Sequence, residues 1–161
     1  MTVLAAALLL AGQSAVTPVQ ANDFGLMCRM GGTLSPDNKL AAFPKPRILA
    51  VLVEPKGAAF APVRTFDPTG LLNGHGISLF NAIPSRPGSY GAATGTQLSD
   101  PSLMQVIFTP RPAQNAPNQW QAAISPLKVE GKPQPVVGLC LRFDNMNEAE
   151  FQDFTSTVSR P

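Results

Sequence analysis

Proline and glycine divide this chain of 161 residues into short segments, because it contains 17 prolines and 13 glycines. Proline cannot donate a backbone hydrogen bond, and glycine gives the backbone extra freedom, so neither favours a long helix or an uninterrupted strand. The runs between them are short, and in several of them apolar and polar side chains alternate. This spacing predicts a mainly β chain whose strands are joined by turns.

Seven runs have the alternation or the apolar character of strands. They are residues 24–30, 47–54, 58–66, 77–83, 103–109, 120–129 and 134–143. The interior of 47–54 is apolar throughout, which predicts a strand covered on both faces. About seven strands in a chain of this length predict a single-domain antiparallel sandwich or a partly open barrel.

Two long segments between these runs are expected to be loops. Residues 84–101 are rich in glycine, serine and alanine, and residues 110–118 are rich in proline, asparagine and glutamine. Loops of this length in a compact domain are either mobile or used for binding.

The C-terminal segment has the pattern of one α-helix. Asn145 and Glu148 have the spacing of a capping box, and Phe151, Phe154 and Val158 follow at intervals that place them on one helical face. The connection from the last strand is short, so we expect the helix to fold back over the sheet. We expect it to cover the four apolar side chains that share one face of that strand. These are Val137, Leu139, Leu141 and Phe143.

The first 21 residues contain no charged side chain and resemble an export signal. Their apolar run, 3–12, has about the length of a secretory signal core, whereas a transmembrane helix needs about 20 residues. Small side chains before Asn22 predict cleavage after Ala21, which would leave 22–161 as one β-rich exported domain. The alternative is a buried N-terminal helix of that domain. The n-region lacks lysine and arginine, so the leader could begin further upstream.

Neither a lipid anchor nor a membrane span is expected in the mature chain. Gln13 stands where an acylated cysteine would have to be, and no second long apolar run follows. No Asn-x-Ser/Thr acceptor occurs, which favours a bacterial periplasm over a glycosylating secretory route.

Cys28 and Cys140 are the only cysteines. In an exported chain they are expected to form a disulfide, because the compartment is oxidising. A redox-active pair would more naturally be separated by two residues than by more than a hundred. The pairing would bring the first and last strands together.

Charge and ligand chemistry exclude several functions. The chain has 12 basic and 10 acidic residues, a net charge of +2, and its arginines are dispersed. Nucleic acid is therefore not an expected partner, because binding to its backbone needs a dense basic surface. One histidine and two cysteines at no known ligand spacing predict no metal, and no motif predicts a cofactor.

Two side chains are candidate ligand contacts. His75 lies between Gly74 and Gly76, where it could approach a ligand or simply occupy a surface turn, which Asn-Gly already favours. Tyr90 is the only tyrosine and lies in the glycine-rich segment 88–95, where its ring could anchor a ligand or pin the loop by burial.

The scarcity of catalytic side chains and the two long loops favour a non-catalytic binding or accessory module whose protein or small-molecule partner is unknown. The first alternative is a hydrolase-like enzyme in which folding brings an acid such as Asp67 or Asp100 to His75. Another is a structural component of an envelope assembly, which would show a large exposed apolar patch or an unprotected edge strand.

Overall fold

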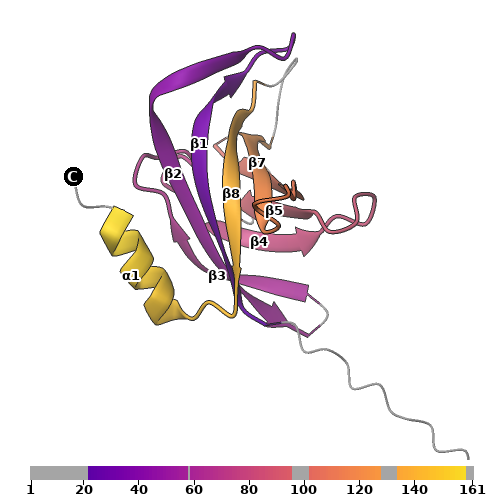
Figure 1. Ribbon diagram of the computed structural model, residues 1–161, viewed down its shortest axis with the longest axis vertical. Helices are drawn as coiled ribbons and strands as arrows, with labels where there is room; N and C mark the ends of the chain where they lie inside the picture. Colours follow the sequence, from indigo (N-terminus) through magenta and orange to yellow (C-terminus); the bar gives the residue numbers. More distant parts are fainter. Residues whose placement is uncertain (1–21, 58, 96–101, 128–133, 159–161) are drawn as a thin grey trace, which may run out of the picture.

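The computed structural model describes residues 22–57, 59–95, 102–127 and 134–158. These residues form eight antiparallel strands that follow one another around a closed barrel, and then one helix (Figure 1). The elements are β1 (Phe24–Leu34), β2 (Leu40–Lys56), β3 (Ala59–Phe66), β4 (Ile77–Ala82), β5 (Tyr90–Thr94), β6 (Met104–Pro110), β7 (Gln119–Pro126), β8 (Val136–Asp144) and α1 (Glu148–Val158). The mainly β architecture with a C-terminal helix is confirmed. The predicted signal segment, 1–21, lies outside the described residues.

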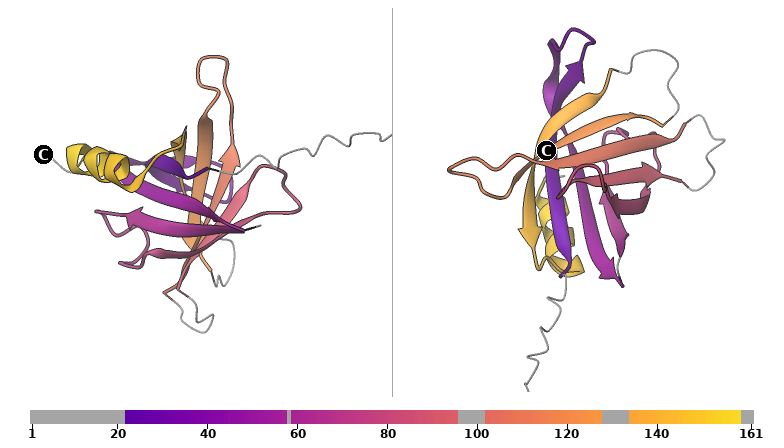
Figure 2. Two further views of the ribbon diagram at one scale, coloured as in Figure 1. Left: turned by 90° about the horizontal axis from the view of Figure 1, so that it is seen from below. Right: turned by 90° about the vertical axis from the view of Figure 1, so that its right-hand side faces the viewer.

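The expected sandwich or partly open barrel of seven strands is wrong in two respects, since the barrel is closed and has an eighth strand. The additional strand, β5, lies inside segment 84–101, which was expected to be a loop. Its residues Gly91, Ala92 and Ala93 are too small to give a clear alternating pattern, yet they pair with β4 on one side and β6 on the other. The other expected loop, 110–118, connects β6 to β7 and projects from the barrel (Figure 2).

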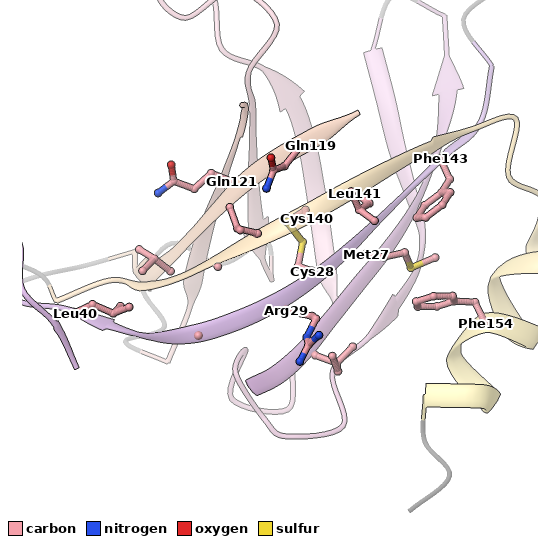
Figure 3. Close-up of a pocket in the computed structure, with 15 residues that line it drawn as sticks. Met27, Cys28, Arg29, Leu40, Gln119, Gln121, Cys140, Leu141, Phe143 and Phe154 are labelled. Atoms are coloured by element: carbon pink, nitrogen blue, oxygen red, sulfur yellow. A yellow bond between two sulfur atoms is a disulfide. The ribbon is translucent and has the colours of Figure 1, made fainter. Parts of the chain in front are cut away.

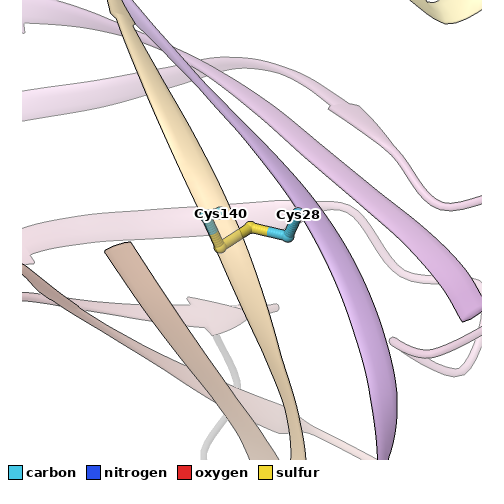
Figure 4. Close-up of a disulfide and its surroundings, with 2 residues drawn as sticks. All are labelled: Cys28 and Cys140. Carbon is cyan, nitrogen blue, oxygen red and sulfur yellow. A yellow bond between two sulfur atoms is a disulfide. The ribbon is translucent and has the colours of Figure 1, made fainter. Parts of the chain in front are cut away.

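The barrel closes where β1 pairs with β8. Along this seam Cys28 lies opposite Cys140, and the two are joined by a disulfide with their Cα atoms 3.9 Å apart (Figure 4). The same strand β1 also pairs with β2 over most of its length. The disulfide therefore links the first and last strands directly.

Aromatic rings fill the interior of the barrel. The ring of Tyr90 lies 5.1 Å from that of Phe80 and is stacked on that of Trp120 at 5.7 Å. Phe24, Phe80 and Phe108 are completely or almost completely buried among the strands. The interior is a packed hydrophobic core, which fits a small eight-stranded barrel.

A second, smaller core lies outside the barrel, between β2 and α1. Phe151 of the helix is buried against Met27, Ala50 and Leu52. The opposite face of β2, which includes Val51, points into the barrel interior. The prediction that this strand is covered on both faces is confirmed, and α1 provides the outer cover.

The expectation that α1 covers the outer face of the last strand is wrong for most of that strand. Phe143 packs against the outer core, but Leu139 and Leu141 remain 54% and 42% exposed. The short connection between β8 and α1 explains the difference. Asn145 adopts a left-handed backbone conformation (φ 60°), and its backbone amide donates a hydrogen bond to the backbone carbonyl of Asp23. The chain then runs toward β2 instead of back along β8.

The cap of α1 is also displaced from its predicted position. The capping box is formed by Asn147 and Glu150, whose side chains each accept a hydrogen bond from the backbone amide of the other. The sequence contains two overlapping Asn-x-x-Glu pairs, and Asn145 belongs to the turn. None of the helices among the described residues is long and apolar enough to cross a membrane.

Removing the disulfide should weaken the barrel at its closing seam. Replacing Cys28 and Cys140 together by alanine releases a constraint across 112 residues, and we expect the free energy of unfolding to fall by about 2–5 kcal/mol. Urea denaturation of the two proteins measures the change, after non-reducing mass spectrometry has verified the bond in the parent. An unchanged midpoint would show that strand pairing alone closes the barrel.

Gly138 should be intolerant of a side chain, because β8 approaches β1 closely there. A Cβ atom at this position would meet the backbone of Arg29 and Met30, whereas a Cβ at Gly31 would meet nothing within 4 Å. We expect Gly138→Ala to cost about 1–3 kcal/mol in urea denaturation. The matched variant Gly31→Ala should cost clearly less, and equal losses would contradict the close approach.

Candidate binding groove on the outer face of the barrel

His75 lies on an exposed turn between β3 and β4. Its Nε2 atom is 3.1 Å from the hydroxyl of Ser102, but within the described ranges no carboxylate hydrogen-bonds the ring. The carboxylate of Asp67 instead accepts hydrogen bonds from the backbone amides of Leu71 and Leu72. Asp100, the other proposed acid, lies outside the described residues. Among the described residues, His75 thus has a hydroxyl within hydrogen-bond distance but no acid, which a hydrolase-like site would also need.

Tyr90 is the first residue of β5 and contributes its ring to the aromatic cluster of the interior. Besides Phe80 and Trp120, the ring meets Phe60 at an edge, with centroids 5.3 Å apart. This arrangement matches the packing alternative raised by the sequence. A ligand contact by Tyr90 stays a prediction.

A largely apolar groove of about 660 Å³ lies on the outer surface of the barrel, above the seam between β1 and β8 (Figure 3). Strands β7 and β2 form its two sides, and α1 reaches one end through Phe154. The lining residues are Met27, Cys28, Arg29, Gly31, Leu40, Ile48, Gln119, Gln121, Val137, Gly138, Leu139, Cys140, Leu141, Phe143 and Phe154.

The strand register places two leucines at the centre of this groove. Leu139 lies opposite Arg29 on β1 and opposite Gln121 on β7. Leu141 lies opposite Met27 on β1 and opposite Gln119 on β7. Across the groove, the glutamines of β7 therefore lie on one side of the two leucines, and the outward-facing residues of β1 lie on the other.

A disulfide and a close approach of two strands lie directly beneath the floor of the groove. Cys28 and Cys140 are both 1% exposed, and their disulfide ties the two strands of the floor together. Gly138 lets β8 lie close against β1. A floor held in this way presents its side chains in a fixed arrangement.

The sides of the groove carry basic and amide side chains. Arg29 is exposed, and among the described residues no carboxylate lies within ion-pair distance of it. On the opposite side, Arg111 donates a hydrogen bond from Nε to the side-chain oxygen of Gln121 at 2.9 Å. The groove is thus apolar along its centre and positively charged beside it.

The turn of the β1–β2 hairpin lies beyond the end of the groove at which Leu40 is found. The hydroxyl of Ser35 donates to the carboxylate of Asp37, and the ammonium group of Lys39 lies 3.0 Å from that carboxylate. Both interactions lower the pKa of Asp37, and the hydrogen bond from Ser35 has the larger effect. Asp37 is therefore ionised and paired within the turn.

The described residues that line this groove offer few groups able to act as a nucleophile or a general base. Its polar side chains are Arg29, Gln119 and Gln121, which recognise groups but are poor nucleophiles and poor general bases at neutral pH. Both cysteines are joined in the disulfide, so neither provides a free thiol. Within the described part of the chain no three histidine, cysteine or acidic side chains are grouped to hold a metal ion.

Comparison of the chain with protein-family models, curated proteins and solved structures finds no match. The alternation of residues 137–143 predicts the apolar row of the groove on β8, but not that this row stays uncovered by the helix.

The two central leucines should contribute little to stability, because each keeps roughly half of its surface exposed to solvent. We expect Leu139→Gln and Leu141→Gln each to change the free energy of unfolding by less than about 1 kcal/mol. The control is Leu52→Ala on the same outer face, where α1 leaves only 2% exposed, and it should cost about 2–5 kcal/mol. Urea denaturation measures all three. Similar losses at all three positions would place the leucines in the core.

Proposed function

We propose that this chain is an exported, non-catalytic binding module that docks its partner in the outer groove above β1 and β8. The observation that carries the proposal is the exposure of Leu139 and Leu141, 54% and 42%, at the centre of an apolar groove. Exposed apolar surface of this kind marks an interaction site when it is contiguous and has polar sides. Arg29 and the two glutamines provide those sides.

The location proposed for this module is the bacterial periplasm. The disulfide between Cys28 and Cys140 is consistent with export, since such bonds persist in oxidising compartments. The charge-free segment 1–21 supports the same proposal from the sequence. Cleavage after Ala21 would leave Asn22 as the first residue of the exported chain.

A structural role in an envelope assembly is the second candidate, and one observation favours it. The groove is an exposed apolar surface, and among the described strands β3 pairs with β2 only from Ala50 onward, leaving one edge of residues 40–49 unpaired. Self-assembly would use either surface to join copies of the chain. Sedimentation analysis separates the candidates, because a binding module stays monomeric over a range of concentrations and an assembly component does not.

The accessibility of the groove can be tested with 1-anilinonaphthalene-8-sulfonate, a dye whose fluorescence rises on exposed apolar surfaces. We expect the folded protein to enhance the fluorescence of the dye, because Leu139 and Leu141 offer apolar contact and Arg29 offers a cation to the sulfonate. Replacing both leucines by glutamine should remove most of the enhancement. The readout is the titration of dye fluorescence against protein concentration.

Leu79→Gln is the matched control, since Leu79 is 45% exposed on β4 and does not line the groove. This variant should keep the fluorescence of the parent. The proposal fails if the parent gives no enhancement, or if the double variant keeps it. Denaturation curves show in each case that the barrel is folded.

A further inference from the structure

We infer that the groove binds an amphipathic helix of a partner protein whose apolar stripe is flanked by acidic side chains. The inference rests on the proposed function and names the class of partner. It follows from the continuity of the groove with an existing helix–sheet contact, from the pairing of its strands, and from its charge.

The groove continues a surface on which the chain already packs a helix. Helix α1 lies along the outside of the barrel, and its Phe151 is buried with Met27 and Leu52. Met27 and Phe154 belong both to this outer core and to the groove lining. A second helix placed beside α1 would therefore extend the same core over the two exposed leucines.

At the floor of the groove, the strands leave no free edge to which an extended peptide could add as a further strand. Along the groove floor, β8 pairs with β1 on one side and with β7 on the other, so its backbone donors and acceptors are used. An occupant must make contact through side chains. Among recurrent modes of peptide recognition, an amphipathic helix lying in an apolar groove makes its contacts in this way.

The spacing of the leucines suits a helix. Leu139 and Leu141 are two residues apart on one strand, which separates them by about 7 Å. Residues i and i+4 of a helix are separated by about 6 Å along its axis and lie on one face. The apolar row from Val137 to Phe143 spans six residue steps, or about 20 Å, and matches three to four turns of helix.

The charge beside the groove selects among such helices. Arg29 is exposed and has no carboxylate partner within the described ranges. On the side of the groove opposite Arg29, the guanidinium of Arg111 donates a hydrogen bond to the side chain of Gln121. Acidic side chains on both flanks of the apolar stripe would meet these two cations. Such complementarity gives specificity and speeds association.

The same charge disfavours a second copy of this chain as the occupant. A symmetric dimer through the groove would pack the surface against itself, because both partners of a two-fold interface use the same residues. Arg29 is directly opposite Leu139 in the register and would approach its own symmetry mate. Like charges brought together in this way oppose association.

The test uses the full chain with its disulfide and three synthetic helical peptides of about 14 residues, which match the groove length. One has a leucine stripe flanked by glutamates, and the second has the same stripe flanked by lysines. The third has the glutamate composition with the leucines scrambled around the helix. Dissociation constants come from chemical-shift titrations at low ionic strength, which also locate the site.

We expect the glutamate peptide to bind at least about tenfold more tightly than the other two, and to shift resonances of the groove residues. Leu139→Gln with Leu141→Gln should weaken binding at least about tenfold. Arg29→Gln should reduce the preference for glutamate over lysine. The controls Leu79→Gln and Arg86→Gln, at exposed positions outside the groove lining, should change neither value.

Three results would overturn the inference: equal binding of the scrambled peptide, equal or tighter binding of the lysine peptide, or shifts located away from the groove. Binding to anionic vesicles and dimer formation are measured in parallel. If the chain binds vesicles or forms a dimer but binds none of the peptides, the inference is also overturned. If dye binding still depends on Leu139 and Leu141 in that case, the groove remains a binding surface and only the helix is wrong. If the dye result fails too, the proposed function falls with the inference.

Discussion

The pairing of β1 with β8 is the interaction on which the rest of the structure depends. It turns a row of hairpins into a closed barrel, and the bond between Cys28 and Cys140 makes the closure covalent. Closure seals the aromatic interior from solvent and satisfies the backbone of the last strand on both sides. A barrel of this kind has no edge at its seam, so it can recognise a partner there only through outward side chains.

That seam also separates two surfaces with different roles. Its inner face holds the cysteines and Gly138, which bring the strands together, and its outer face carries Leu139 and Leu141. The disulfide and the close strand contact therefore lie directly beneath the groove. A side chain on the outer face can be exchanged with little effect on closure, because its neighbours on the inner face make different contacts. Buried and exposed side chains thus alternate along this part of the strand.

Local pattern predicted the strands with large side chains, the double cover of 47–54, and the existence of α1. It missed β5, since Gly91, Ala92 and Ala93 provide almost no contrast between faces. It also placed the helix on the wrong strand. The outward-facing side chains of β2 and β8 are both apolar, and the sequence does not show which of the two rows the helix covers. Alternation shows which residues point outward, whereas the choice of cover depends on the turn at Asn145 and on three-dimensional packing. The groove escaped detection for this reason.

The placement of α1 leaves apolar surface that folding does not use. Complete burial of a leucine side chain is worth about 1.5–3 kcal/mol, and Leu139 and Leu141 keep roughly half of their surface in water. If the chain covered β8 with its own helix, burial of these leucines would raise the free energy of unfolding. Here that burial is available to an occupant instead, beside a cation, Arg29, that has no acidic partner in the described part of the chain. The same surface that makes the fold less stable than it could be is therefore the surface best suited to association.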